Sequence, residues 1–201
     1  GWVTRAGDQA DEPFRGHFHL PPLADGTGAG NLEVHTGLFI EGNPFSWPLE
    51  DIWARSRPLM VGPGRVPAPE DLLLHILLHF SWSHVARMGP WRTFRDIRAM
   101  AESRTIEWER FTALARSTGG EAPAFWTLRL ARRCGITEVP GAVEEAIRPV
   151  RLRVLEPLLE RHFAGQWFPA EGPCPSRRME RALWRVAMGG LGRHGEANLP
   201  W

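Results

Sequence analysis

Residues 69–85 of this chain, PEDLLLHILLHFSWSHV, decide its fold. Apolar side chains fill almost every position of 72–78, which is typical of a helix buried inside a larger helical body. Pro69 suits the first helical position because its missing N–H is not needed there, and the two acidic residues after it complement the helix dipole. The pattern predicts one long helix over about 70–85.

A polar stripe runs along this apolar helix, formed by Asp71, His75, His79 and Ser83. Their spacing of four keeps them on one slowly drifting face, and a buried helix does not need such a stripe to fold. Two histidines at i, i+4 can hold zinc, but no glutamate lies between them to act as a metalloprotease base. The spacing favours hydrogen bonding of both histidines to neighbouring elements. His84, five residues after His79, is expected to point away.

Helical patterns continue to the end of the chain. A helix-breaking effect is expected at Pro149 and Pro157, which should kink or divide the helix that contains them. A Pro/Gly-rich loop is expected over 58–69. The further helices are predicted over about 49–56, 91–102, 107–117, 123–134, 143–162 and 176–188.

The first part of the chain has a β pattern. Alternation over 15–20 and a strand over about 32–40 flank a glycine-rich turn, which predicts a hairpin. The glycines of 26–30 precede a strand and lack a following Lys-Ser or Lys-Thr, so they indicate a hairpin loop and not a phosphate loop. An isolated hairpin is marginal in water, so these strands should pair with a further element.

The predicted fold is therefore α+β, mainly α. A small N-terminal β-hairpin or sheet (1–45) precedes a bundle of five to seven helices (46–201).

Composition excludes several classes of function. The net charge of +1 creates no field for nucleic acid or membrane surfaces, and no apolar run approaches the roughly 18 residues of a membrane span. All 24 basic residues are arginine, so no lysine can form a Schiff base. Cys134 and Cys174 make no CxxC pattern and are interpreted as reduced thiols of a cytoplasmic protein, with a single bridge as the alternative. The start of the chain does not have the pattern of a signal peptide.

Glu33 and His35 are one residue apart on the predicted strand, so both should project from the same side. A carboxylate held at a strand centre suits a magnesium ligand in two-metal phosphoryl transfer. The alternative, which alternation alone favours, is a solvated sheet face flanked by inward Leu32 and Val34.

Three charged residues, Arg92, Arg95 and Asp96, mark the polar face of the 91–102 helix. An arginine here can bind a phosphate through two hydrogen bonds, with Asp96 orienting it. The spacing favours the alternative, an exposed Arg92–Asp96 ion pair worth about 0.3–0.5 kcal/mol.

Two later helices carry basic faces, interpreted as solvated surface with binding of an acidic polymer as the alternative. Their residues are Arg129, Arg132 and Arg133, then Arg177, Arg178, Arg181 and Arg185.

A series of segments in this order resembles the uncharacterised nucleotidyltransferase family of the polymerase-β-like superfamily, over roughly residues 30–140. The segments are LEVH…LF (32–39), DIWARSRP (51–58), PEDLLLHILLHFSWSH (69–84), WRTFRDIRAM (91–100), IEWERFTALAR (106–116) and FWTLRLARRCG (125–135).

The resemblance implies a catalytic sheet with three carboxylates, two from an Asp-x-Asp motif after a glycine-containing turn and one from a later strand. Residues 1–45 would then be a partial catalytic β element. Glu33 matches the third carboxylate and would bind magnesium. His79 and Asp96 match recurrent residues of the family's helix pair and are assigned as catalytic. His35, His75 and Arg92 are assigned to substrate binding.

The chain departs from the family in one respect: no Asp-x-Asp follows a glycine turn, and Asp8 and Asp11 are spaced by three. In the family, that segment precedes the point where this chain begins. The chain is therefore interpreted as a C-terminal portion or truncated relative, inactive alone, for which the missing N-terminal segment would be a partner.

The leading hypothesis is Mg²⁺-dependent transfer of a nucleotidyl group from an NTP to a small-molecule or peptide acceptor in the full-length form, in a family often found beside bacterial biosynthetic clusters. The second is a non-catalytic helical interaction module. The third is a zinc hydrolase built on His75 and His79.

Overall fold

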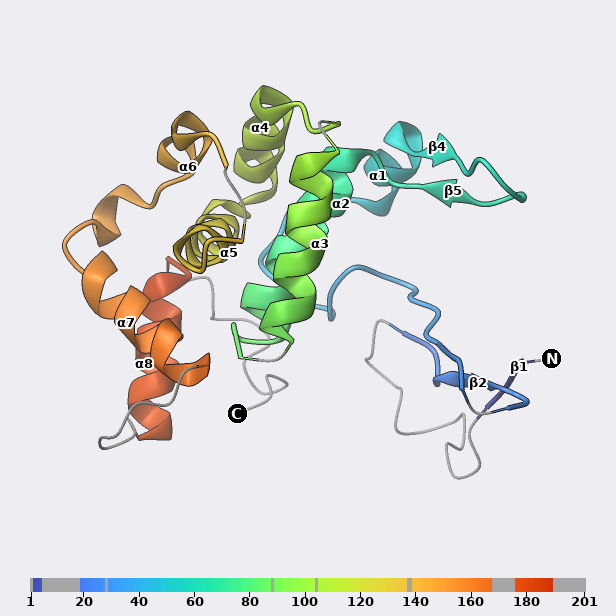
Figure 1. The fold of residues 1–201 in the computed structure, drawn as a ribbon, viewed down its shortest axis with the longest axis horizontal. Helices are drawn as coiled ribbons and strands as arrows, with labels where there is room; N and C mark the ends of the chain where they lie inside the picture. Colours follow the sequence, from blue (N-terminus) through green and yellow to red (C-terminus); the bar gives the residue numbers. More distant parts are fainter. Residues whose placement is uncertain are drawn as a thin grey trace. The chain divides into compact units, whose positions relative to one another are not determined.

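The computed structural model describes residues 2–4, 19–27, 29–87, 89–103, 105–136, 139–167 and 176–189. The chain divides into two compact units, 1–43 and 44–201 (Figure 1). Helices dominate the described ranges and the strands are few and short, so the predicted α+β, mainly α class is confirmed.

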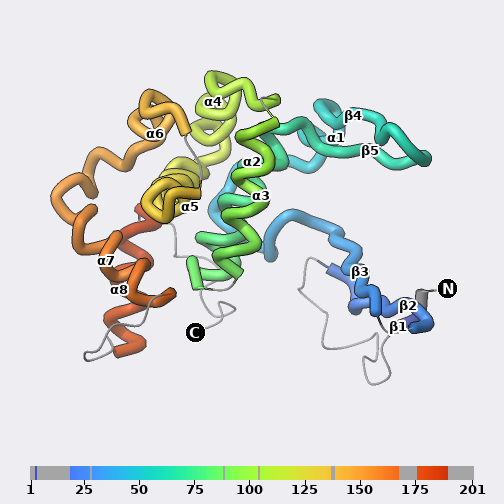
Figure 2. The backbone as a smooth tube through the Cα atoms, in the orientation of Figure 1, coloured from blue at the N-terminus to red at the C-terminus, as the bar shows by residue number. Residues whose placement is uncertain are grey.

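Unit 1 contains a three-stranded antiparallel sheet in the order β1-β2-β3 (Figure 2). Its strands are β1 (Trp2–Thr4), β2 (Leu23–Asp25) and β3 (Asn31–Leu32). The glycine-rich turn joins β2 to β3, which confirms the hairpin loop. Asp25 closes this loop: its carboxylate accepts hydrogen bonds from Thr27 N and Oγ1 at 3.0 and 2.8 Å and from Ala29 N at 3.1 Å.

The predicted strand over 32–40 is wrong in its extent, because β3 ends at Leu32. Beyond it, His35 forms only an isolated antiparallel bridge with His19. The predicted strand over 15–20 lies outside the described residues except for its last two positions, as do Asp8 and Asp11.

A pair of prolines explains the short strand. Leu23 pairs with Leu32, and Leu20 N donates to Val34 O at 2.8 Å, so Pro21–Pro22 lies across from Glu33. Proline has no N–H to continue a ladder. Glu33 therefore sits in a gap between β3 and the His35 bridge, and not at the centre of a strand.

Unit 2 is helical, with α2 at its centre in contact with α3, α4 and α5. Its core includes Leu73, Leu74, Leu77, Phe80, Trp82, Phe94, Phe111, Phe125 and Trp126. Its elements are α1 (Leu49–Arg55), β4 (Arg57–Pro58), β5 (Arg65–Val66), α2 (Pro69–Leu78), the π-helix η1 (His79–Ser83), α3 (Pro90–Glu102), α4 (Trp108–Thr118), α5 (Glu121–Arg133), α6 (Gly141–Ala146), the 3₁₀ helix η2 (Val150–Leu152), α7 (Glu156–Trp167) and α8 (Arg177–Ala187).

Proline divides the helix predicted over 143–162, as expected. Pro149 precedes η2, and Pro157 is the second residue of α7. This division accounts for eight α-helices among the described residues. The loop predicted over 58–69 also contains a short strand, because β5 pairs antiparallel with β4.

The helix predicted over 70–85 changes type at its middle: α2 ends at Leu78 and η1 follows. The carbonyl of Leu77 accepts hydrogen bonds from Ser81 Oγ at 2.8 Å and Thr127 Oγ1 at 3.0 Å. An α-helix would use that carbonyl for the N–H of Ser81. Hydroxyl groups that share a ladder carbonyl loosen the helix locally, which favours the wider π-turn.

Two other expectations concern cysteine and membranes. Cys134 has a free thiol, and Cys174 lies outside the described residues. In the part of the chain that the structure describes, no helix combines the length and apolar character that a membrane span needs.

Candidate functional site

Glu33 and His35 in unit 1 lie on the same side of the chain, with 3.8 Å between Glu33 Oε2 and His35 Nε2. Their side chains are 55% and 36% exposed. Leu32 and Val34, expected to point inward, are 41% and 40% exposed. The side chains on both sides of this short segment are therefore exposed to solvent, and the Glu33 carboxylate is accessible.

Three histidines form a row along the end of α2 and η1, called here the histidine row: His75, His79 and His84. The ring centroids of His75 and His79 are 5.5 Å apart, and those of His79 and His84 are 4.5 Å apart with the rings edge to face (83°).

The expectation that His84 points away from His79 is wrong. His84 N donates to His79 O at 3.0 Å, the i to i+5 hydrogen bond of a π-turn. Five residues correspond to about 500° in an α-helix, which leaves the fifth residue about 140° away, whereas the π-turn brings it back above the first.

His84 is half-buried, and this burial, followed by the charge of Arg92, lowers the pKa of its imidazole. Lowering the pKa favours the neutral ring, which keeps one nitrogen lone pair to accept a hydrogen bond or a proton. Arg92 itself is exposed in the first turn of α3. The structure thus brings Arg92 near the histidine row.

Asp96 does not pair with Arg92 as the spacing favoured. It accepts hydrogen bonds from its neighbour Arg95, at 3.4 Å from Nε and 3.3 Å from NH2. The Asp96 side chain is 42% exposed, so this contact contributes little to stability.

Asp71, the first residue of the polar stripe, is an anchor and not an open ligand. Its side chain is 2% exposed and accepts two hydrogen bonds from Arg55, at 2.9 and 2.7 Å. This paired contact fixes α1 on α2. A carboxylate buried this deeply needs a cationic partner, and the position of Arg55, sixteen residues earlier, gives no periodic signal that would identify it.

Among the residues that the structure describes, no group of three or more His, Cys, Asp or Glu side chains is arranged to hold a metal ion. The zinc hypothesis on His75 and His79 therefore gains no support. Glu33 fits one oxygen ligand of a magnesium ion, but the described residues do not supply the further carboxylates of a metal pair.

A comparison with protein families finds one match: the family model described as uncharacterised nucleotidyltransferase covers residues 1–135. No curated protein and no solved structure matches the chain. The matched range includes Glu33, the histidine row, Arg92 and Asp96, and it ends just after α5. The match covers more than half of the chain, which therefore belongs to the uncharacterised nucleotidyltransferase family.

Proposed function

We propose that this protein acts in the transfer of a nucleotidyl group from a nucleoside triphosphate to a small acceptor, and that the histidine row with Arg92 binds the phosphate or acceptor side. The name of the family indicates nucleotidyltransferase activity. The observation that carries the rest is the half-buried His84, edge to face with His79 and under the influence of the Arg92 charge.

The chemistry of these groups suits a phosphate and a nucleophile side by side. The guanidinium of Arg92 is exposed and presents donors in a fork that matches phosphate oxygens. A neutral His84 accepts a hydrogen bond from an acceptor hydroxyl or amine and can take its proton. His75 and Asp96 complete the proposed surface. The His75 ring lies 5.5 Å from the His79 ring, one turn earlier in the helix, and Asp96 lies on the same helix as Arg92.

Local backbone geometry also supports a functional role for this segment. π-helical turns occur frequently at functional sites. Immediately after η1, the non-glycine residues Val85 and Ala86 have φ values of 45° and 57°. Such conformations are strained and cluster at sites where the surroundings hold them for a purpose.

Glu33 and His35 belong to the metal side of the proposal. The accessible Glu33 carboxylate would supply one magnesium ligand, with His35 beside it to contact substrate. Since the described residues do not form a metal pair, no chemical step is assigned to the ion here.

Calorimetric titration of the full chain with ATP, GTP, CTP and UTP in the presence of Mg²⁺ tests the phosphate side. Arg92→Gln should weaken binding of the preferred nucleotide by about tenfold, the loss of a charge-assisted hydrogen bond. Arg98→Gln on the same helix is the matched control, because Arg98 is exposed and pairs with Glu102. Equal affinities for the two variants would reject the role of Arg92.

The metal side has its own matched pair of variants. Glu33→Gln should weaken binding of Mg²⁺ in a calorimetric titration with the metal alone, whereas Glu41→Gln, at an exposed glutamate of the same unit, should preserve it. A Glu33→Gln protein with unchanged magnesium binding would remove Glu33 from the metal assignment.

One observation favours the second function, an interaction module. The hairpin of β4 and β5 carries apolar side chains at its tip, and Met60 and Val61 are 101% and 82% exposed. Apolar groups at this exposure are typical of contact with another protein. Met60→Asp with Val61→Asp should leave nucleotide binding unchanged if transfer is the function, and a loss of all biological activity with intact nucleotide binding would favour the module.

A further inference from the structure

Two tryptophans from the C-terminal helices donate hydrogen bonds to main-chain carbonyls of the π-helix η1 and of the turn that follows it. Trp184 Nε1 in α8 donates to Ser81 O at 2.8 Å. Trp167 Nε1 at the end of α7 donates to Ala86 O at 2.8 Å. Carbonyl groups displaced from the α-helical ladder need such donors when they are buried.

Each indole also packs on an aromatic ring of η1. The ring centroids of Trp184 and Trp82 are 5.0 Å apart, and those of Trp167 and Phe80 are 5.9 Å apart. Each tryptophan therefore combines a directed hydrogen bond to a carbonyl with a ring contact. Together these two contacts fix the orientation of the turn and its distance from the C-terminal helices.

Both tryptophans lie beyond residue 135, where the family match ends. The segment that carries the histidine row is thus held by helices outside the matched range. One of the two bonds ends on Ala86, which has a φ of 57° and needs its surroundings to hold that conformation.

We infer that Trp184 and Trp167 are positioning residues: they hold the π-turn that places the His84 ring against the His79 ring. Without them, the segment can relax to an α-helix, in which His84 lies about 140° around the helix from His79. The catalytic consequence rests on the function proposed above, but the positioning itself does not.

Trp→Phe variants of the full chain test this inference, because phenylalanine keeps an aromatic ring and removes only the donor and part of the volume. Trp184→Phe and Trp167→Phe are compared with Trp126→Phe. Trp126 is also buried and donates to a main-chain carbonyl, Ala187 O at 2.9 Å, at the end of α8 and away from η1. This control loosens α8 without removing a bond to the π-helix.

Two measurements report on the conformation of the π-turn and require no nucleotide. NMR titration of the histidine rings reports the environment of His84, and hydrogen exchange reports the amides of His84 and Ala86, whose N–H groups bond to His79 O and Phe80 O. We expect Trp184→Phe and Trp167→Phe to raise the His84 pKa toward its ordinary value and to speed exchange of these amides at least tenfold relative to Trp126→Phe. All three should lower the melting temperature by similar amounts.

The inference fails if both variants lower the melting temperature as Trp126→Phe does but leave the His84 titration and the amide exchange unchanged. The indoles then contribute stability alone. Trp167 is only half-buried, so its variant provides the test if Trp184→Phe does not fold. Absent nucleotide binding together with a changed His84 titration would reject the proposed function and retain the positioning role.

Discussion

Opposite faces of α5 belong to two polar networks of different chemistry. Thr127 faces α2, where its hydroxyl donates to Leu77 O, and the carbonyls of Ser81 and Ala86 likewise accept from neutral indole groups. One ion pair, between Arg87 and Glu180 of α8, lies at the end of this segment. Arg129, about 200° further around the helix, faces α6 and α7 and enters a set of ion pairs.

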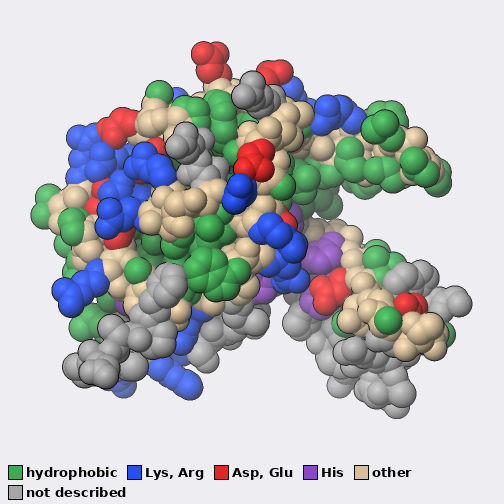
Figure 3. Space-filling view, viewed as in Figure 1, with side chains coloured by type: hydrophobic (Ala, Val, Ile, Leu, Met, Phe, Trp, Pro, Cys, Tyr) green, Lys and Arg blue, Asp and Glu red, His purple; other side chains and the backbone are tan. Residues whose placement is uncertain are grey.

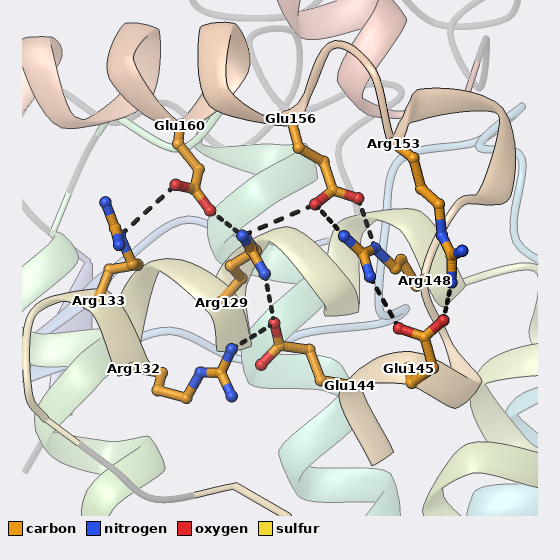
Figure 4. Close-up of polar contacts among 9 residues, drawn as sticks. All are labelled: Arg129, Arg132, Arg133, Glu144, Glu145, Arg148, Arg153, Glu156 and Glu160. Carbon is orange, nitrogen blue, oxygen red and sulfur yellow. Dashed lines mark hydrogen bonds and ion pairs between the residues drawn. The ribbon is translucent and has the colours of Figure 1, made fainter. Parts of the chain in front are cut away.

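This second set, the arginine–glutamate network, joins α5, α6, α7 and the residues on either side of η2 (Figure 4). Arg129 contacts Glu144 at 2.9 Å and Glu156 at 3.7 Å, and it also pairs with Glu160. Arg148 makes two hydrogen bonds of 2.6 Å to Glu156. The remaining members are Arg132, Arg133, Glu145 and Arg153.

The arginine faces were interpreted as solvated surface, and for Arg129 that is wrong: its side chain is 20% exposed, and those of Glu144 and Glu156 are 6% and 3% exposed. Figure 3 shows basic and acidic side chains intermixed over α6 and α7. The comparison teaches that a charged network fixes the outer helices, whereas the carbonyl groups in and around η1 are held mainly by neutral donors, whose bonds salt does not screen.

The largest expected effect is on the charged side. Arg129→Met should lower the free energy of unfolding by about 3 kcal/mol, because it removes the least exposed cation of the network and leaves each of its three nearly buried carboxylates with a single outer arginine. Urea denaturation measures this loss. Arg133→Met is the matched control, since Arg133 is 69% exposed with one contact at 3.5 Å, and it should cost at most about 1 kcal/mol. Equal losses of unfolding free energy for both variants would show that the buried ion pairs contribute no more to stability than the exposed one.

Substitutions among the neutral groups should lower the free energy of unfolding by less, and salt should not change that loss. Thr127→Val should lower the free energy of unfolding by about 1 kcal/mol, because Leu77 O keeps its bond from Ser81 Oγ. The loss should be equal at low and high salt, whereas the Arg129→Met loss should shrink at high salt, since ions screen the outer charges. Thr112→Val, whose hydroxyl bonds within α4, serves as control. A salt-dependent Thr127→Val effect would contradict the division into two networks.

Sequence patterns predicted the helical body but not these networks, for identifiable physical reasons. The apolar run of 72–78 and the prolines at 149 and 157 act locally, so they fixed α2 and the division before α7. The π-turn depends on Thr127, fifty positions along the chain from Leu77, and spacing within one helix cannot reveal that bond. His84 was therefore assigned to the wrong face.

The candidate site shows the same limit. Glu33 was placed at a strand centre because its own segment alternates, but the prolines across from it interrupt the ladder. Asp96 was expected to bond Arg92 by i,i+4 spacing and instead bonds the adjacent Arg95. The shared side of Glu33 and His35, and the shared face of His75 and His79, follow directly from spacing and were predicted; the ring contact of His75 with His79 was not.

Protonation of His84 should produce a smaller change in stability, one that depends on pH. Its pKa is lowered in the folded protein from an ordinary value of 6.5, mainly by burial, so the unfolded chain takes up a proton that the folded protein resists. Stability should therefore be unaffected well above pH 6.5 and should fall as the pH drops below it. His84→Gln should flatten this fall in urea denaturation between pH 7.5 and 5.5.

His162, whose pKa burial also lowers, adds a fall in the same direction. His162→Gln should therefore flatten the curve as well. A steeper fall in His84→Gln than in the unmodified protein would contradict the assignment of a neutral His84.

The smallest expected effect concerns the one cation whose charge acts on His84. Arg92→Gln should raise the His84 pKa only part of the way to 6.5, because burial, the larger cause, remains. NMR titration at low salt measures the shift, and Arg98→Gln should produce none. High salt should shift the unmodified protein in the same direction, since Arg92 is exposed and its charge is screened. If the His84 pKa changes with neither Arg92→Gln nor salt, Arg92 does not face the histidine row.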